Sequence, residues 1–194
     1  MSSLEGQQFG NYQLVRQIGR GSFSEVYLCR HLHLQALAAA KILYGMFWPE
    51  EKEQFKQEAK IIATFKHPHI LRLFEFGIQN AIPYLIMEYA PNGTLRDRYP
   101  EGSVVPLPVI ISSLQQVASA LAYVHRHNHV HCDVKPENML IDAQGDIVVG
   151  DFAIAHPHSI ISQRILDPDP LGTIHYMAPE HLEGKPQPAS DQYA

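Results

Sequence analysis

The chain has few cysteines, no excess of positive charge and no long apolar run. Its 194 residues contain only Cys29 and Cys132, too few for a disulfide framework and in keeping with a reducing, cytoplasmic setting. The net charge of −5 gives no indication of a nucleic-acid-binding surface. The N-terminus lacks the basic and apolar regions of a signal peptide. No apolar stretch approaches the roughly 20 residues of a membrane span, so we expect no membrane segment in this chain, although a membrane-tethered parent protein stays open.

The segment 131–152, HCDVKPENMLIDAQGDIVVGDF, carries the strongest chemical pattern. It sets Asp133, Lys135, Asn138 and Asp151 in fixed order around two short apolar runs, which we expect to be strands joined at Gln144-Gly145. Transfer of a phosphate needs one carboxylate to orient a hydroxyl, and hard oxygen ligands such as Asn and Asp to hold Mg²⁺. The spacing therefore indicates phosphoryl transfer.

A glycine-containing turn between two expected strands, 12–20 and 24–32, provides a second pattern. Gly19 and Gly21 would let the backbone bend and approach phosphate oxygens without an intervening Cβ. Two glycines alone are a weak signal, and a plain hairpin stays open. A dinucleotide-binding fingerprint is disfavoured, because the turn leads into β-prone residues rather than a helix.

One lysine and one glutamate fall in apolar surroundings. Lys41 lies near the end of an apolar run, 36–43, that we expect to be a buried strand, although a snorkelling surface lysine is an alternative. Glu58 lies on an expected helix over 49–66, in a stripe with Phe55, Ile62 and Phe65. Pairing Lys41 with Glu58 would resolve the cost of burying each charge.

Together these segments resemble the protein kinase family, and most closely its bacterial serine/threonine members. The resemblance covers residues 12–194 and includes the AxxK, HCDVKPEN and GTxxYMAPE motifs. It implies an α+β, two-lobed protein-kinase-like fold. The N-lobe, 12–90, would hold an antiparallel sheet and one helix. The C-lobe, 91–194, would be mainly helical and incomplete, because the chain ends at the start of the helix whose aspartate, Asp191, bonds the catalytic loop in kinases.

The resemblance also implies a role for each group. Asp133 would orient the substrate hydroxyl, Lys135 would steady the γ-phosphate, and Asn138 and Asp151 would hold Mg²⁺, with Mg-ATP as the phosphate donor. The hinge backbone from Glu88 to Ala90 would bond the base. The implied ATP-binding set comprises Ile18, Gly19, Arg20, Gly21, Ser22, Phe23, Ser24, Val26, Ala39, Lys41, Glu58, Met87, Glu88 and Ala90.

Three positions depart from the family pattern. Ser24 replaces the third glycine of the turn, for which we expect a working but stiffer loop. Cys132 replaces the arginine that pairs with a phosphorylated activation loop, which predicts activity independent of such phosphorylation. Ala153 replaces the glycine after Asp151-Phe152, and its Cβ is expected to hinder a backbone flip of that segment.

Several alternatives stay open. The departures and the chain's end leave open a pseudokinase, a nucleotide-binding scaffold or an inert fragment. Against this alternative, all the groups that the resemblance assigns to phosphate or metal are present, namely Lys41, Glu58, Asp133, Asn138 and Asp151. A small-molecule phosphotransferase shares the Asp-x4-Asn loop, but the peptide-binding segment 172–180 and Thr173 with Lys135 favour proteins with Ser/Thr hydroxyls as substrates. The alternating histidines at 125–131 suggest a metal site only weakly, because residues two apart on a helix end do not face together. They are instead expected to form a solvated helix end. Ser159, Ser162 and Thr173 are candidate phosphosites, with ordinary loop residues as the alternative.

Overall fold

The computed structural model describes residues 3–21, 24–44, 49–152 and 175–194. These residues form two compact units, each of which is described by itself. Unit 1 contains residues 1–64 and 72–89, and unit 2 contains residues 65–71 and 90–194. The backbone therefore passes from one unit to the other three times.

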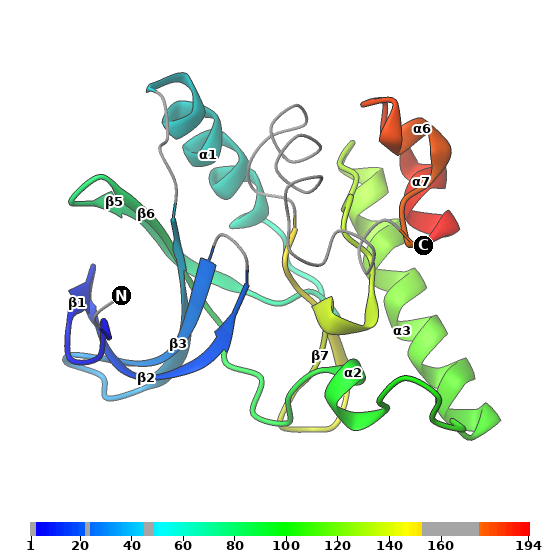
Figure 1. The fold of residues 1–194 in the computed structure, drawn as a ribbon, viewed down its shortest axis with the longest axis horizontal. Helices are drawn as coiled ribbons and strands as arrows, with labels where there is room; N and C mark the ends of the chain where they lie inside the picture. The colour runs from blue at the N-terminus through cyan, green and yellow to red at the C-terminus, as the bar shows by residue number, and fades with distance from the viewer. Residues whose placement is uncertain (1–2, 22–23, 45–48, 153–174) are drawn as a thin grey trace. The chain divides into compact units, whose positions relative to one another are not determined.

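Unit 1 is built on a six-stranded antiparallel sheet in the order β1-β2-β3-β4-β6-β5 (Figure 1). The strands predicted at 12–20, 24–32 and 36–43 are confirmed, and a further hairpin follows the helix, with its turn at Asn80 and Ala81, both with positive φ. The strands are β1 (Gln8–Phe9), β2 (Tyr12–Arg20), β3 (Ser24–His31), β4 (Leu37–Leu43), β5 (Leu73–Gln79) and β6 (Ile82–Met87).

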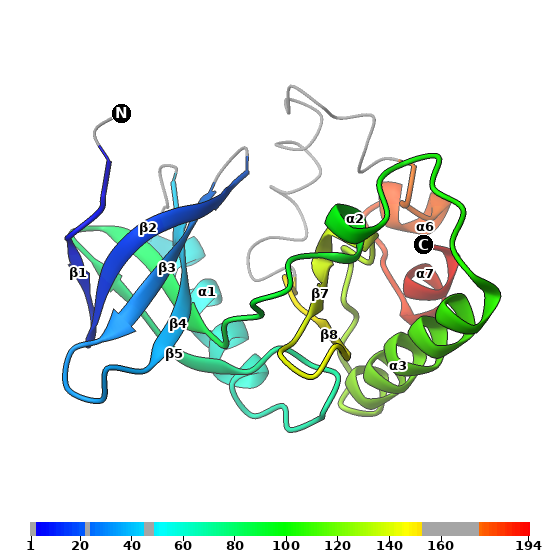
Figure 2. The same ribbon diagram turned by 90° about the horizontal axis from the view of Figure 1, so that it is seen from below.

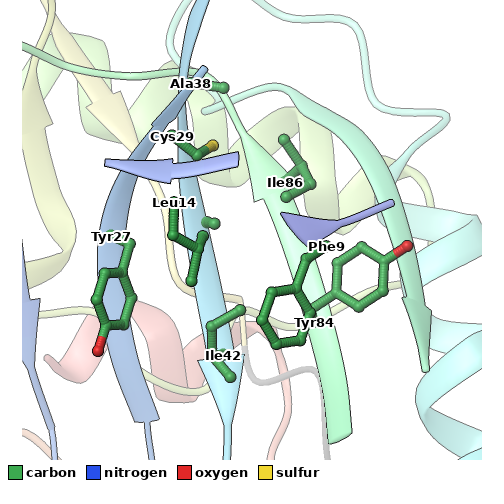
Figure 3. Packing of buried hydrophobic residues seen from close by; sticks show 9 residues of the cluster. Phe9, Leu14, Tyr27, Cys29, Ala38, Ile42, Tyr84 and Ile86 are labelled. Carbon is green, nitrogen blue, oxygen red and sulfur yellow. The ribbon is translucent and has the colours of Figure 1, made fainter. Parts of the chain in front are cut away.

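The core of unit 1 lies on one face of this sheet, where side chains two apart on each strand gather (Figure 3). On β4, Ala38, Ala40 and Ile42 point into it, so Ala39 and Lys41 occupy the opposite face. The cluster consists of Phe9, Leu14, Tyr27, Cys29, Ala38, Ala40, Ile42, Tyr84 and Ile86. Burial raises the pKa of the Cys29 thiol to about 12, so Cys29 acts as a small apolar side chain here.

The single described helix of unit 1, α1 (Pro49–Ile62), buries Phe55 and Ala59 and lies against β5. The prediction that it extends to residue 66 was wrong. The chain turns after Ile62, and Phe65 packs in unit 2 instead, with its ring 5.9 Å from that of Tyr123. An apolar residue three positions past a helix end continues the 3.6-residue pattern, so spacing alone could not locate that end.

Unit 2 contains short helices, one long helix and a two-stranded ladder. α6 and α7 lie beside α3 in both ribbon views (Figures 1 and 2). The ladder pairs Leu140 with Val148, which confirms the two strands expected around Gln144-Gly145. The elements are α2 (Leu95–Arg98), α3 (Leu107–Arg126), the 3₁₀ turn η1 (Pro136–Asn138), β7 (Met139–Ile141), β8 (Ile147–Val149), α6 (Pro179–Leu182) and α7 (Pro188–Tyr193).

The long helix α3 buries one end of its apolar stripe and exposes the other. Val117, Leu121 and Val124 are buried, whereas Ile110 and Leu114 are exposed. The expectation that no apolar stretch reaches membrane length was wrong for α3. This helix has 20 residues, and the mean hydropathy of an 18-residue window within it is 1.5, so it is long and apolar enough to cross a membrane. A single helix of this kind is weak evidence for a membrane span, because core helices of other proteins share its composition.

Candidate active site

The face of the unit 1 sheet opposite the core carries several of the implied nucleotide-binding residues. In the strand register, Gly19 lies opposite Val26, and Val26 opposite Lys41. Residues directly opposite each other in antiparallel strands point to the same face, so these positions form one row across β2, β3 and β4. Ala39, two residues before Lys41, lies on the same face opposite Met87. Residues as far apart in the sequence as Gly19 and Met87 thus lie on one surface of the sheet.

The turn between β2 and β3 is closed by a hydrogen bond from the Gly21 N–H to the Ser24 carbonyl, at 2.8 Å. Ser24 is an ordinary strand residue opposite Leu43. Ile18 lies at the bulge of β2, between the paired residues Gln17 and Gly19, and is 36% exposed. Ser22 and Phe23 lie outside the described residues.

Neither Gly19 nor Gly21 has a positive φ. A Cβ added to Gly19 would meet Val26 at an ordinary 3.6 Å, and one added to Gly21 would meet the Ser24 hydroxyl oxygen at 3.4 Å. As far as the described residues go, unit 1 therefore has room for a Cβ at both positions. The glycines are therefore not needed for the backbone conformation of the turn. Their effect is that no side chain covers its surface.

Lys41 and Glu58 both belong to unit 1. Lys41 is half-buried on β4, and Glu58 is half-buried on α1. The Glu58 Oε1 accepts a hydrogen bond of 2.9 Å from the Gln54 amide, and its Oε2 is buried. The pairing of Lys41 with Glu58 stays a prediction.

The implied hinge begins at the end of β6. Met87 pairs with Ala39 on one side and Leu73 on the other. The Glu88 N–H donates to the Arg72 carbonyl at 2.8 Å, so Glu88 can offer a base only its carbonyl oxygen. Ala90 is buried and is the first residue of the second part of unit 2.

In unit 2, two side chains converge on the carboxylate of Asp133. The Asn138 amide donates to Oδ2 at 2.9 Å and to the Asp133 carbonyl at 2.7 Å. The Lys135 Nζ lies 3.2 Å from Oδ2, and the two side chains of this ion pair are only 18% and 12% exposed. Both groups that the Asn138 amide faces are acceptors, so its NH₂ must point to Asp133 and its Oδ1 away from it. The loop thus orders a carboxylate, a cation and an amide oxygen.

His131 and Asp191 hold the backbone of this loop through hydrogen bonds. The fully buried His131 ring accepts the Asp133 N–H at Nδ1, at 3.2 Å, and its Nε2 lies 2.9 Å from the Gly150 carbonyl. These partners fix the neutral tautomer with the proton on Nε2, and burial lowers the pKa of His131 accordingly. The Asp191 carboxylate accepts the N–H groups of His131 and Cys132 at 2.8 and 2.9 Å, as its family role predicts.

The β7–β8 ladder brings Asp151 to the same loop. The Gly150 N–H donates to the Asn138 carbonyl at 2.9 Å. This hydrogen bond holds the backbone next to Asp151 against that of Asn138. Asp151 has a φ of 57°, in the left-handed region, and Phe152 is buried with its ring 4.6 Å from that of His131. Asp tolerates this conformation better than most residues.

Of the histidines at the end of α3, His127 is exposed, as expected for a solvated helix end, whereas His125 and His129 are half-buried. His125 Nε2 lies 2.8 Å from the Asp191 Oδ2, and His127 Nδ1 lies 2.8 Å from the Tyr123 carbonyl. His129 is half-buried with its ring 5.8 Å from that of Phe65. The contact between His125 and Asp191 was missed, because nothing in the local pattern relates positions 66 apart.

The histidines packed near Phe65 predict an acid-sensitive fold. Burial lowers the pKa of both His129 and His67, so the unfolded chain binds protons more readily than the folded one. Stability is then complete above the ordinary histidine pKa of about 6.5 and is lost as the pH falls below it. Thermal unfolding followed from pH 7.5 to 5 should show this fall, and His129→Leu should flatten it. The exposed His33→Gln is the control, and an unchanged slope in His129→Leu would contradict the assignment.

A further link in unit 2 was not predicted from the sequence. The Arg96 guanidinium on α2 donates to the Glu137 carboxylate at 2.8 Å and to the Tyr176 hydroxyl at 2.9 Å. The Glu137 carboxylate raises the pKa of Arg96. This side chain ties α2 to the turn that follows Lys135 and to the segment before α6.

The chain belongs to the protein kinase family: residues 12–194 match the family described as protein kinase domain. Its α+β fold class is the one expected for that family, with the antiparallel sheet in unit 1. Ala153, Ser159, Ser162 and Thr173, which the sequence singled out, lie outside the described residues.

The relatives it resembles are serine/threonine kinases of bacteria and protein kinases of animals. It is 37% identical over 183 residues to a probable serine/threonine-protein kinase of Clostridium perfringens, covering 92% of this chain and 26% of that protein. It is 33% identical over 178 residues to serine/threonine-protein kinase PrkC of Bacillus subtilis, covering 90% and 27%. Mouse Aurora kinase B is 32% identical over 177 residues, covering 90% and 50%. The chain thus spans about a quarter of the length of these two bacterial relatives.

Proposed function

We propose that this chain carries out ATP-dependent transfer of the γ-phosphate to serine and threonine hydroxyls of proteins. The observation that carries the proposal is the convergence of Lys135 and Asn138 on the Asp133 carboxylate, at 3.2 and 2.9 Å. A carboxylate held in this way can accept the proton of a substrate hydroxyl, and the neighbouring ammonium can balance charge on a transferring phosphoryl group.

The residues present fit Mg²⁺ as the accompanying cation. The Asn138 Oδ1 faces away from Asp133. Asp151 is the next residue after Gly150, whose N–H donates to the Asn138 carbonyl. Both are hard oxygen donors of the kind that Mg²⁺ prefers, and the bound ion would neutralise phosphate charge. Asn138 and Asp151 would hold it.

The nucleotide phosphates are assigned to unit 1. The row of Gly19, Val26 and Lys41 supports this, as do two glycines that the fold itself does not require. Lys41 would bind the α- and β-phosphates, and the Glu88 carbonyl and Ala90 backbone would bind adenine. The two cysteine thiols suit action in the cytoplasm.

The test is transfer of labelled γ-phosphate from Mg-ATP to a generic protein substrate and to the chain itself, followed by identification of the labelled amino acid. Label on serine and threonine is the expected result. Label on an aminoglycoside or choline offered in parallel, with none on protein, would establish a small-molecule phosphotransferase. Nucleotide binding without any transfer would indicate a scaffold.

We expect the transfer rate to survive phosphatase treatment. The half-buried Cys132 thiol, which donates to the Val130 carbonyl at 3.6 Å, offers no cation to a phosphorylated segment. Rates measured before and after treatment with a broad-specificity phosphatase should agree. A sharp fall that ATP preincubation restores would contradict this prediction.

A further inference from the structure

Unit 1 contains a buried carboxylate that the proposed chemistry does not use. Glu25, on β3, is only 7% exposed. The hydroxyls of Tyr27 and Tyr44 both donate to its Oε2 at 2.7 Å, and the Arg20 Nε lies 3.9 Å from its Oε1. The two tyrosine hydroxyls lower the pKa of Glu25, with that of Tyr27 first, so the carboxylate is charged at neutral pH.

These four residues come from the segments that frame the phosphate-binding surface. Arg20 is the last residue of β2 and lies opposite Glu25, so this pair closes the base of the turn at Gly21. Glu25 is one residue before Val26, and Tyr44 is three residues after Lys41.

The carboxylate lies on the face of the sheet away from Val26 and Lys41. Glu25 alternates with Val26 along β3 and lies opposite Ile42 of the core cluster. Tyr27 extends along this same core face (Figure 3). The contacts of Glu25 therefore link the turn at Gly21 to β4 on the core face of the sheet, and they leave free the opposite face, where a nucleotide would lie.

We propose that Glu25 is a positioning residue for ATP, which fixes the turn at Gly21 relative to Lys41 through Tyr27, Tyr44 and Arg20. This inference rests on the proposed function, because the quantity that it explains is nucleotide affinity. Burying a carboxylate among apolar side chains is a poor way to gain stability, since well-packed apolar residues serve as well or better. What a carboxylate with several fixed donors adds is one geometry for the segments that supply those donors.

The structure offers a matched control in the same cluster. The Tyr84 hydroxyl donates to the Glu75 Oε1 at 2.9 Å, and Glu75 also accepts the Asn11 amide at 3.3 Å. This pair lies on β5 and β6, so it has the chemistry of the Tyr44–Glu25 pair but no connection to the turn at Gly21. Removing either tyrosine hydroxyl costs one hydrogen bond to a carboxylate.

The experiment measures the Kd of a non-hydrolysable ATP analogue with Mg²⁺ by calorimetry, and KM and kcat for ATP, in the full chain and its variants. Tyr44→Phe and Glu25→Gln are each expected to raise Kd and KM roughly tenfold while kcat changes little, in line with one lost charge-assisted hydrogen bond. Glu25→Leu should raise them further, so that glutamine acts as a partial rescue. Tyr84→Phe should leave Kd unchanged although it lowers the melting temperature.

Two results would overturn the inference. Equal Kd in wild type, Tyr44→Phe and Glu25→Gln would show that Glu25 does not position the nucleotide. Equal increases in Tyr44→Phe and Tyr84→Phe would show that affinity follows general stability. Failure of the wild-type chain to bind the analogue or to transfer phosphate would instead remove the proposed function, and this inference with it.

Discussion

Asp133→Asn is expected to lower the rate of phosphate transfer by about 10²–10⁴-fold, the usual contribution of a positioned general base. The side chain keeps its size, but the amide is a much weaker proton acceptor than the carboxylate. It also loses the ion pair with Lys135, which spans 3.2 Å in unit 2. Single-turnover transfer from labelled Mg-ATP measures the effect without interference from product release.

The control for Asp133→Asn is Asp146→Asn, which removes the same charge from an exposed position at the start of β8. It should transfer phosphate at the wild-type rate. The Kd for the ATP analogue should be similar in all three proteins, because Asp133 is assigned to the acceptor rather than to the nucleotide. If Asp133→Asn keeps the wild-type rate, the proposed mechanism is wrong.

Asp191→Asn is expected to lower the free energy of unfolding by about 3–5 kcal/mol, as when one partner of a buried charged contact is removed. The Asp191 side chain is 1% exposed, and its two oxygens accept the N–H groups of His131 and Cys132 and contact His125. An asparagine offers one acceptor oxygen, and its NH₂ would face a backbone N–H. At least one buried donor is then left without a partner.

Urea denaturation measures this loss, and hydrogen exchange at the His131 and Cys132 amides locates it. His125→Gln, which removes only the side-chain contact, should cost roughly 1 kcal/mol and leave both amides protected. Because Asp191 holds the backbone that carries Asp133, phosphate transfer should also fall in Asp191→Asn. A variant with wild-type stability and protection would contradict the role assigned to this carboxylate.

Much of the fold was accessible from the sequence, because β2, β3, β4 and the β7–β8 ladder have a local pattern of alternation or a turn residue. The order of Asp133, Lys135 and Asn138 was equally local, since these residues lie within six positions of one another. Their assigned roles, like those of Lys41 and Glu58, stay predictions.

Contacts between distant positions could not be predicted in the same way. The Arg96 contacts with Glu137 and Tyr176 join positions up to 80 apart, and no local pattern around this half-buried arginine indicates its partners. Glu25 could be read only as one polar residue in an alternating strand, although its neighbours bury it. The end of α1 was misjudged because Phe65 continues the apolar spacing of a helix while it packs in the other unit.

The assignment of residues 65–71 to unit 2 has a consequence during synthesis on the ribosome. Phe65, Ile70 and Leu71 are buried in the folded chain, yet the residues that cover them include Tyr123, Val149 and Phe152. At ordinary elongation rates the ribosome needs on the order of ten seconds to add the residues in between. The sheet of unit 1 can form in that interval. The side chains of Phe65, Ile70 and Leu71 stay exposed to water or bound to a chaperone until the residues that cover them have been synthesised. The nascent chain is therefore expected to be most prone to aggregation after residue 89 emerges and before residue 152 does.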